Sequence, residues 1–471
     1  MRVLLVRPGR TGQVGLDRMS LVEPLGLEMV AASLPGHDVQ LADLRAGDDL
    51  AHLLRRFRPD WCGVGCAFTT EVRSCLALAR QVKQLLPECF VFVGGPHPSL
   101  CPQDFADRAV DAIVVGEAEA TVPELAAALA QNGDLSLVPG LVLNGPQGQT
   151  ATGPRSAIAD LDTLPFPARA LVAGRERSYY LGFQRPLALV ETARGCPHRC
   201  TFCAVWRFHQ GRVRYKSPVR VVEELARVRA PHVFFTDDNF LSGVTRAYAL
   251  ADAILTAGVR KTYTFQCRAD TVAQHPDLLK HWREVGRLTV FLGLEKIAQE
   301  DLDLLRKKST VRENEAAIET LTTLGIGFTP NFIVPAEADR AEFARLRQYL
   351  QDHRLHNAGF SILTPLPGTE LYEQRQGELT TRECELFDLF HAVTPTRLPL
   401  AEFYEEFASL WRTARGVRAG RRGAQVRKLL GGLLTGRVSL SSMRLGLDVA
   451  RALSDPKVYL LGHQPPAPAG R

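Results

Sequence analysis

The sequence lacks a run of apolar residues long enough to cross a lipid bilayer as a helix. Its first residues, Met1 to Val6, enter a strand-like pattern directly, without the apolar segment and cleavage site of a secretory signal. It also lacks a large excess of either charge, because 57 basic and 51 acidic residues leave a formal net charge of +6. A balance this small does not indicate a nucleic-acid partner, and we expect a cytoplasmic protein.

Size and composition indicate a globular protein with more than one domain. The hydrophobic fraction is 45% and the charged fraction 23%, which are ordinary values for folded chains and exclude disordered and fibrous classes. A chain of 471 residues is longer than a single hydrophobic core serves, so we expect two or three domains.

The first part of the chain alternates short apolar runs with longer amphipathic stretches. The runs are residues 3–6, 39–41, 62–66, 91–93 and 113–115, and the candidate helices are 25–34, 48–57, 71–86 and 121–131. This alternation predicts an α/β domain with a doubly wound parallel sheet over residues 1–140, whose ligand crevice lies beyond the carboxyl ends of the strands. The residues expected there include Gly94, Gly95, His97, Gly116 and Glu117. Glycine lets a bulky ligand approach the backbone, although any one of these glycines could simply turn the chain.

A second α/β region is expected after a linker. Residues 141–180 are rich in proline, glycine and polar residues and predict the linker. Strand candidates then follow at 187–191, 232–235, 262–266, 288–292, 328–333 and 359–363. These six units predict a partial (β/α)6 barrel over residues 181–375, with its active face at the carboxyl ends of the strands. The remaining residues, 376–471, show helical patterns and predict a helical C-terminal region.

Ten cysteines in a cytoplasmic chain indicate metal or redox chemistry, or inert burial, rather than disulfides. Only Cys196, Cys200 and Cys203, spaced C-x3-C-x2-C after the first barrel strand, have the spacing of metal ligands. Three thiolates on one loop can bind three irons of a 4Fe-4S cluster and leave the fourth iron open to another ligand. A structural zinc site needs a fourth ligand, for which His198 and His209 are the candidates. A zinc-stabilised nucleic-acid-binding module is therefore the non-enzymatic alternative.

The cysteine spacing, the aromatic Phe202 before the last cysteine and the six-unit barrel that follows resemble the radical SAM superfamily. The resemblance implies that the open iron binds S-adenosylmethionine (SAM) and that Phe202 lies against its adenine. It also implies an iron-sulfur enzyme that needs an electron donor such as flavodoxin or ferredoxin.

Polar residues after later barrel strands are candidates for the remaining SAM contacts. Asp237, Asp238 and Asn239 could accept hydrogen bonds from the ammonium group of SAM. Arg268 could bind its carboxylate, and Glu295 could accept from its ribose hydroxyls. Each residue also has a structural alternative, since aspartate and asparagine cap helices and Arg268 could pair with the nearby Asp270.

Together the two predicted domains resemble the cobalamin (B12)-binding branch of this superfamily over about residues 1–375. Val93–Ser99 and Val115–Glu119 look like loops of its B12 domain, which implies that Gly94, Gly95, His97, Gly116 and Glu117 contact cobalamin. The Asp-x-His-x-x-Gly signature, whose histidine binds cobalt in many other B12 proteins, is absent, and members of this branch commonly bind cobalamin without it. The resemblance implies a methyltransferase that moves a methyl group from methylcobalamin to an unactivated carbon.

Three segments, Phe202–His209, Phe235–Phe240 and Leu389–Thr396, resemble hopanoid C-3 methylases, which implies a lipid substrate. A B12-dependent oxidative cyclase and a natural-product C-methylase are alternatives with the same cofactors. Methylthiotransfer is a further alternative, because Cys62, Cys66 and Cys101 could carry a second cluster.

A basic segment near the C-terminus is the candidate for membrane contact. Its cations, with no acidic residue among them, are Arg412, Arg415, Arg418, Arg421, Arg422, Arg427 and Lys428. A leucine-rich stretch follows, with Leu429, Leu430, Leu433 and Leu434. This pattern predicts either peripheral contact with the inner membrane surface or a solvated basic face over a small helical core.

Overall fold

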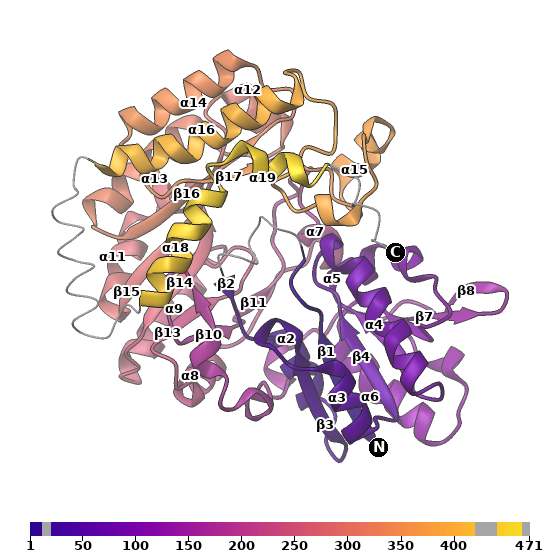
Figure 1. Cartoon of the computed structure of the whole chain (residues 1–471). Helices are drawn as coiled ribbons and strands as arrows, with labels where there is room; N and C mark the ends of the chain where they lie inside the picture. Colours follow the sequence, from indigo (N-terminus) through magenta and orange to yellow (C-terminus); the bar gives the residue numbers. More distant parts are fainter. Residues whose placement is uncertain (12–19, 420–439, 464–471) are drawn as a thin grey trace.

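Two parallel sheets, one in each half of the chain, form the framework of the molecule (Figure 1). The computed structural model describes residues 1–11, 20–419 and 440–463. The N-terminal sheet and its helices lie on one side of the molecule, and the second sheet with the C-terminal helices lies on the other.

The N-terminal sheet is doubly wound, as the sequence predicts. Its five parallel strands run in the order β3 (Asp38–Asp43), β1 (Arg2–Arg7), β4 (Trp61–Gly65), β5 (Phe90–Gly94) and β6 (Ala112–Val114). Helices α3 (Leu50–Phe57) and α4 (Val72–Leu85) contribute to the core on one face, while α2 (Leu25–Ala32) and α6 (Ala118–Ala130) contribute to the core on the other. Burial on both faces explains why these strands read as continuous apolar runs.

An antiparallel hairpin extends this sheet past the boundary predicted at residue 140. Strand β7 (Leu141–Gly145) pairs with β6, and β8 (Gly148–Ala151) pairs with β7. The side-chain amide of Asn144 anchors β7 by donating to the carbonyl oxygens of Phe105, Asp107 and Val110. The predicted linker therefore begins as sheet, because the turn residues Gly145 to Gly148 join two strands rather than start a loop.

The second sheet is the predicted open barrel, with six parallel strands in sequence order. They are β10 (Leu187–Val190), β13 (His232–Phe235), β14 (Thr262–Arg268), β15 (Arg287–Glu295), β16 (Gly327–Val334) and β17 (Gly359–Ile362). The main helices between them are α8 (Pro218–Arg227), α9 (Val244–Thr256), α11 (Pro276–Val285), α13 (Val311–Thr323) and α14 (Arg340–Asp352). Strands β10 and β17 are the two edges and do not pair with each other, so the barrel is incomplete.

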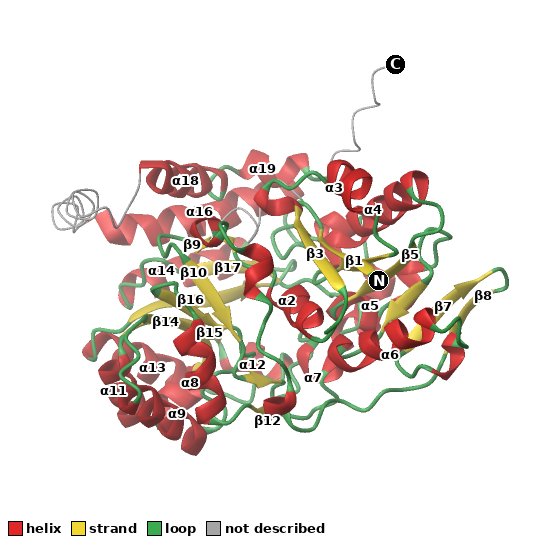
Figure 2. Cartoon of the chain, turned by 90° about the horizontal axis from the view of Figure 1, so that it is seen from below, coloured by secondary structure: helices red, strands yellow, loops and turns green. Residues whose placement is uncertain are grey.

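The C-terminal region is helical and packs against the barrel. Helices α16 (Leu400–Ala419), α18 (Leu440–Ala452) and α19 (Pro456–Leu461) lie together on one side of the molecule (Figure 2). Aromatic side chains of α16 and α19, among them Phe403 and Tyr459, are buried in the barrel core. Within the described ranges, no helix is both long and apolar enough to span a membrane.

Part of the basic segment is used inside this helical region. Arg412 donates to Glu405 and to the carbonyl oxygen of Ser454, and Arg415 donates to the carbonyl oxygen of Ala450. These two cations join α16 to the last two helices and are not free to bind lipid. The prediction of membrane contact also depends on the side chains from Arg418 to Leu434. These side chains lie outside the described residues.

Candidate active site

The three clustered cysteines lie on one loop that a two-stranded ribbon closes. We call residues 195–213 the cluster loop; it runs from β11 (Ala193–Arg194) to β12 (Arg214–Tyr215), and these strands pair antiparallel. Gly195 starts the loop with φ of +92°, and a Cβ there would collide with the carbonyl oxygen of Arg212. Only glycine fits at this crossing, which explains the residue before Cys196.

The donor set fits an iron-sulfur cluster better than a single zinc ion. Two sulfurs bound to one tetrahedral zinc lie ~3.8 Å apart, as zinc-sulfur bonds of about 2.3 Å require. In the described part of the chain, three donor atoms approach within 4.8 Å only at His97, Cys101 and Asp104, so the three sulfurs of the cluster loop are spread more widely. A four-iron cluster needs such spacing, because each thiolate binds a different iron.

The charges around these thiols differ, and two cations lie near Cys200. Burial raises the pKa of Cys200, while the charges of Lys307 and Arg268 lower it in part. Burial raises the pKa of Cys203 to about 12, so this thiol stays protonated until a metal displaces its proton. Phe202 lies half-buried in the loop beside Cys203, where the sequence predicts contact with adenine.

The three polar residues after β13 are Asp237, Asp238 and Asn239, and they differ in their hydrogen-bond partners. The Asp237 carboxylate is buried and accepts from the backbone N–H groups of Thr192 and Ala193 at 2.7 and 3.0 Å. It holds the end of β10 in place, where internal donors compensate this buried charge, and its contact with SAM stays a prediction. Asp238 faces the cavity described below and accepts from the Gly195 N–H at 3.1 Å. Burial raises its pKa to about 6.

Asn239 is the next candidate at this strand end, and it lies outside the residues that line the cavity. Its side chain is 3% exposed, and neither its amide nitrogen nor its amide oxygen has a hydrogen-bond partner. A buried amide left unpaired costs free energy, so a ligand group is the expected partner. Asp238 and Asn239 thus keep the predicted role towards SAM.

Two further predicted SAM contacts are held by protein partners. Arg268 donates to the Asp270 carboxylate at 3.0 and 3.1 Å and to the Lys307 carbonyl oxygen at 2.6 Å. The structural alternative for Arg268 is therefore the observed one. Glu295 accepts from the Lys307 ammonium at 2.7 Å, which leaves its carboxylate paired rather than free.

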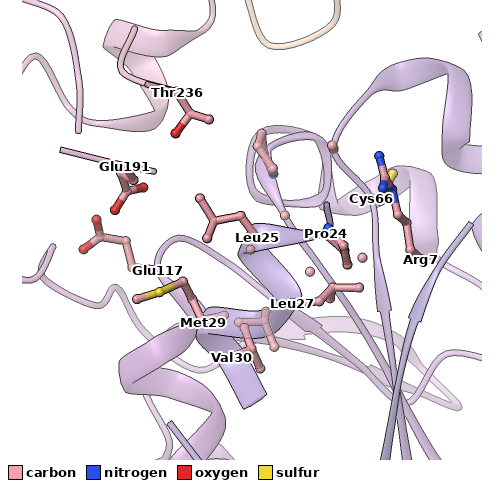
Figure 3. Close-up of a pocket in the computed structure, with 18 of the residues that line it drawn as sticks. Arg7, Pro24, Leu25, Leu27, Met29, Val30, Cys66, Glu117, Glu191 and Thr236 are labelled. Carbon is pink, nitrogen blue, oxygen red and sulfur yellow. The ribbon is translucent and has the colours of Figure 1, made fainter. Parts of the chain in front are cut away.

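A cavity of about 580 Å³ lies between the two sheets, at the carboxyl ends of β1, β4, β5, β6, β10 and β13. Figure 3 shows Leu25, Leu27, Met29 and Val30 of α2 along one wall and Glu191, Glu117 and Thr236 on another. The cluster loop reaches the same space through Ala204, Val205, Phe208 and His209. The cavity therefore joins the predicted cobalamin crevice to the predicted SAM site.

Glycines form the N-terminal floor of the cavity. Gly65, Gly94, Gly95 and Gly116 all line it, as does Glu117. Gly95 has φ of +126°, and a Cβ there would collide with the carbonyl oxygen of Cys66. A floor without side chains admits a large flat ligand against the backbone, which suits a corrin ring.

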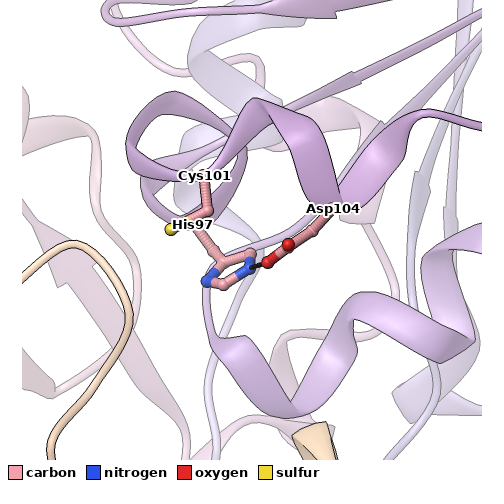
Figure 4. Close-up of side chains that lie close together, drawn as sticks. All are labelled: His97, Cys101 and Asp104. Carbon is pink, nitrogen blue, oxygen red and sulfur yellow. Dashed lines mark hydrogen bonds and ion pairs between the residues drawn. The ribbon is translucent and has the colours of Figure 1, made fainter. Parts of the chain in front are cut away.

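His97 is not among the residues that line the cavity, and its contact with cobalamin stays a prediction. It lies in α5 (Pro96–Leu100) and is 4% exposed, and Figure 4 shows its ring beside Cys101 and Asp104. Its Nδ1 lies 3.1 Å from the Thr69 hydroxyl and its Nε2 lies 3.0 Å from the Asp104 carboxylate. The helical turn after Gly95 rotates this ring into the domain, where both nitrogens find protein partners.

The structure adds functional candidates that the sequence patterns did not indicate. Arg194 bonds Glu117, Glu119 and Glu191, and it lines the cavity two residues before Cys196. Glu191 also lines the cavity, and its position directly after a barrel strand could have identified it. The α2 wall could not have been found, because its apolar pattern is that of any packed helix.

Comparison with known proteins agrees with both halves of this architecture. Residues 14–126 match the B12 binding domain family, and residues 190–350 match the radical SAM superfamily. The hopanoid C-3 methylase of Methylococcus capsulatus is 35% identical over 457 residues, which cover 94% of this chain and 86% of the relative. The chain belongs to the cobalamin-binding radical SAM family. It is an enzyme, a B12-dependent radical SAM methyltransferase that uses a 4Fe-4S cluster, SAM and cobalamin.

Other matches are more distant in sequence. The hopanoid C-2 methylase of Rhodopseudomonas palustris is 26% identical, over 80% of this chain and 71% of its own length. Two solved structures share the fold: the methyltransferase TsrM from Kitasatospora setae and the cobalamin-dependent enzyme OxsB. TsrM has a TM-score of 0.62 and 20% identity, covering 81% of this chain and 76% of its own. OxsB has a TM-score of 0.69 and 16% identity, covering 98% of this chain and 74% of its own.

Proposed function

We propose that the enzyme methylates the C-3 position of a hopanoid lipid. The observation that carries the proposal is the 35% identity with the Methylococcus capsulatus hopanoid C-3 methylase, which extends over 94% of this chain. A match of this length extends beyond the two cofactor domains into the C-terminal region. Similarity to the C-2 methylase is lower and covers less of the chain, which favours C-3 as the position.

The walls of the cavity suit an apolar polycyclic substrate. Leu25 and Met29 from α2 face it from one direction, and Leu189, Val205 and Phe208 line the barrel side. These side chains exclude water from a reaction between carbon centres. When bound, SAM on the cluster supplies a carbon radical and cobalamin supplies the methyl group.

The charged groups around the cavity hold the site rather than move protons. Glu117 and Glu191 both accept from Arg194, so neither is a free base. Asp238 and Asn239 would orient the amino-acid part of SAM at the end of β13. Radical methyl transfer needs no protein general base.

The test is product analysis with the reconstituted holoenzyme. The enzyme is loaded anaerobically with iron, sulfide and methylcobalamin, then given SAM, reduced flavodoxin and diploptene. We expect 5'-deoxyadenosine, S-adenosylhomocysteine and a hopanoid heavier by one methylene, with the new methyl at C-3 by NMR. The Cys200→Ala variant is the control. SAM cleavage that yields a C-2 product or no methylated hopanoid would contradict the proposal.

We also propose that the enzyme takes electrons from flavodoxin or ferredoxin and meets its lipid at the inner membrane surface. The lipid substrate and the cations between Arg418 and Lys428 support the second part. Co-sedimentation with anionic vesicles tests it. We expect binding that is lost when Arg421, Arg422, Arg427 and Lys428 become serine, while Arg412→Ser in α16 leaves it unchanged. Equal binding by all three proteins would contradict it.

A further inference from the structure

The carboxylate of Glu117, in the N-terminal domain, bonds residues at both ends of the cluster loop. Arg194 precedes the loop and Arg214 follows it, and the two are paired residues of the β11–β12 ribbon. Glu117, at the end of β6, accepts from Arg194 Nη1 at 2.9 Å. The same carboxylate accepts from Arg214 Nη1 at 2.8 Å, and Arg214 Nη2 lies 2.8 Å from it as an ion pair.

This three-residue group is buried and charged. The side chains of Glu117, Arg194 and Arg214 are only 8%, 8% and 9% exposed. Burial acts to raise the pKa of Glu117, but the bonds from Arg214 and Arg194 outweigh it and lower the pKa to about 2. The carboxylate therefore stays ionised at every pH at which the enzyme works. Bidentate pairing of this kind also fixes orientation, which a single contact would not.

The same residue is connected to the floor of the cavity. Its neighbour Gly116 donates its N–H to the Ser99 hydroxyl at 2.9 Å, and that hydroxyl donates to the Gly95 carbonyl at 2.7 Å. Gly95, Gly116, Glu117 and Arg194 all line the cavity. A short chain of hydrogen bonds thus runs from the glycine floor to the base of the cluster loop.

We propose that Glu117 is a positioning residue that fixes the cluster loop relative to the cobalamin cavity. The site of SAM cleavage is thereby held at the distance from cobalamin that methyl transfer requires. The sequence analysis assigned Glu117 to cobalamin binding, whereas its carboxylate bonds are all to protein groups. The proposal rests on B12-dependent methyl transfer and does not depend on the hopanoid as substrate.

A positioning role for Glu117 means that this residue controls the distance between SAM at the cluster and the methyl group on cobalamin. A misplacement of ~1 Å by a change remote from the reacting atoms can cost about 100-fold in rate. Loss of the Glu117 charge removes an ion pair at both ends of the loop together. Glu119 is a partial counterpart, because among the two arginines it bonds only Arg194. The two glutamates therefore allow a graded experiment.

The experiment uses the reconstituted holoenzyme with Glu117→Gln, Glu119→Gln and Glu124→Gln. Glu124 is the matched control, since it forms an ion pair with Arg155 in the same domain and lies away from the cavity lining. Pulsed EPR measures the distance distribution between the reduced cluster and cob(II)alamin. We expect a broader or shifted distribution in Glu117→Gln, a smaller change in Glu119→Gln and none in Glu124→Gln.

Turnover with diploptene adds a second readout. In Glu117→Gln we expect methylated product per 5'-deoxyadenosine to fall about tenfold or more, with iron and cobalamin contents retained. A wild-type distance distribution and product ratio in Glu117→Gln would overturn the proposal. Loss of both cofactors in Glu117→Gln and also in Arg214→Gln would overturn it as well, because Glu117 would then only stabilise the fold. If the wild type gives no methylated hopanoid, the hopanoid assignment fails, while the EPR comparison still decides the role of Glu117.

Discussion

The carboxyl ends of the two sheets face one cavity but are built in different ways. The N-terminal sheet ends in glycines, among them Gly94, Gly95 and Gly116, which line the cavity. The barrel ends in charged residues that are mostly bound to the protein itself. Asp237 holds the end of β10, and Arg268 is paired with Asp270.

The difference reflects the size of what each sheet binds. We expect a large, flat cofactor to be accommodated where side chains are absent, so glycines are the residues expected at its site. A cluster with a small ligand is accommodated by a loop of defined shape, and that shape needs fixed charges around it. Substitutions at the first edge should therefore affect cobalamin, and substitutions at the second should affect the cluster, SAM or stability.

The largest expected effect is at the cluster loop. Cys200→Ala removes one of three iron ligands, so we expect loss of the cluster and no detectable 5'-deoxyadenosine. Iron analysis, visible spectra and chromatography of SAM products measure this. Cys384→Ala, which alters a half-buried thiol outside the loop, should keep both iron and SAM cleavage. Retained cleavage in Cys200→Ala would refute the cluster assignment.

The next effect separates the two edges. Gly95→Ala places a Cβ against the Cys66 carbonyl oxygen at positive φ, so we expect cobalamin affinity to fall about tenfold or more while the cluster is retained. Gly148→Ala is the matched control, because Gly148 also has a positive φ, of +113°, but no atom within 4 Å of the added Cβ. Cobalamin titration compares the two variants. Equal affinities of the two variants would contradict a role of Gly95 in the cobalamin site.

A smaller effect distinguishes neighbouring aspartates of the barrel edge. Asp237→Asn loses charged hydrogen bonds to Thr192 and Ala193, so we expect the free energy of unfolding to fall by about 2–3 kcal/mol. Asp238→Asn should change stability less and weaken SAM binding more. Urea unfolding and SAM titration test both variants. The reverse pattern would restore Asp237 as a SAM contact and make Asp238 structural.

Most of the fold could be predicted from the sequence, because apolar periodicity records which face of each element is buried. All six barrel strands fall within the predicted runs or extend them; β14, for example, continues from the predicted end at 266 to Arg268. The hairpin β7–β8 was missed, since its Gly-Pro-Gln-Gly turn has the composition of a loop. Local composition identifies a turn but does not say whether the flanking residues pair.

The site could be predicted only where a residue's chemistry depends on sequence neighbours. The three cysteines are such a case, because their spacing along one loop is the signal. Glu117 lies after a strand end, as expected, but its bonds to Arg194 and Arg214 could not be predicted, since these partners are distant in sequence. The protein partners of Asp237 and His97 could not be predicted for the same reason. Whether a polar side chain faces a ligand or a protein partner is decided by tertiary contacts that periodicity does not contain.

A buried ionic group near the cavity makes the interface between the two regions sensitive to pH. Arg169 bonds Glu23 at 2.6 Å and Glu224 at 2.8 Å, and thereby joins the segment between the domains to a cavity-lining residue and to α8. Glu28 of α2 lies beside this group, fully buried, with one carboxylate oxygen unpartnered. Burial and the neighbouring Glu23 raise the pKa of Glu28 to about 8.

This raised pKa predicts that stability falls as pH rises. Between the usual carboxyl pKa of 4.5 and about 8, folded Glu28 keeps a proton that the unfolded chain has lost. The free energy of unfolding should therefore decrease through this window, by up to about 1.4 kcal/mol per pH unit for one proton. Glu28→Gln should remove that slope, whereas Glu124→Gln, at an exposed carboxylate, should keep it. Urea unfolding at pH 6 and pH 8 measures the difference, and identical slopes for wild type and Glu28→Gln would show that Glu28 is ionised in the folded protein.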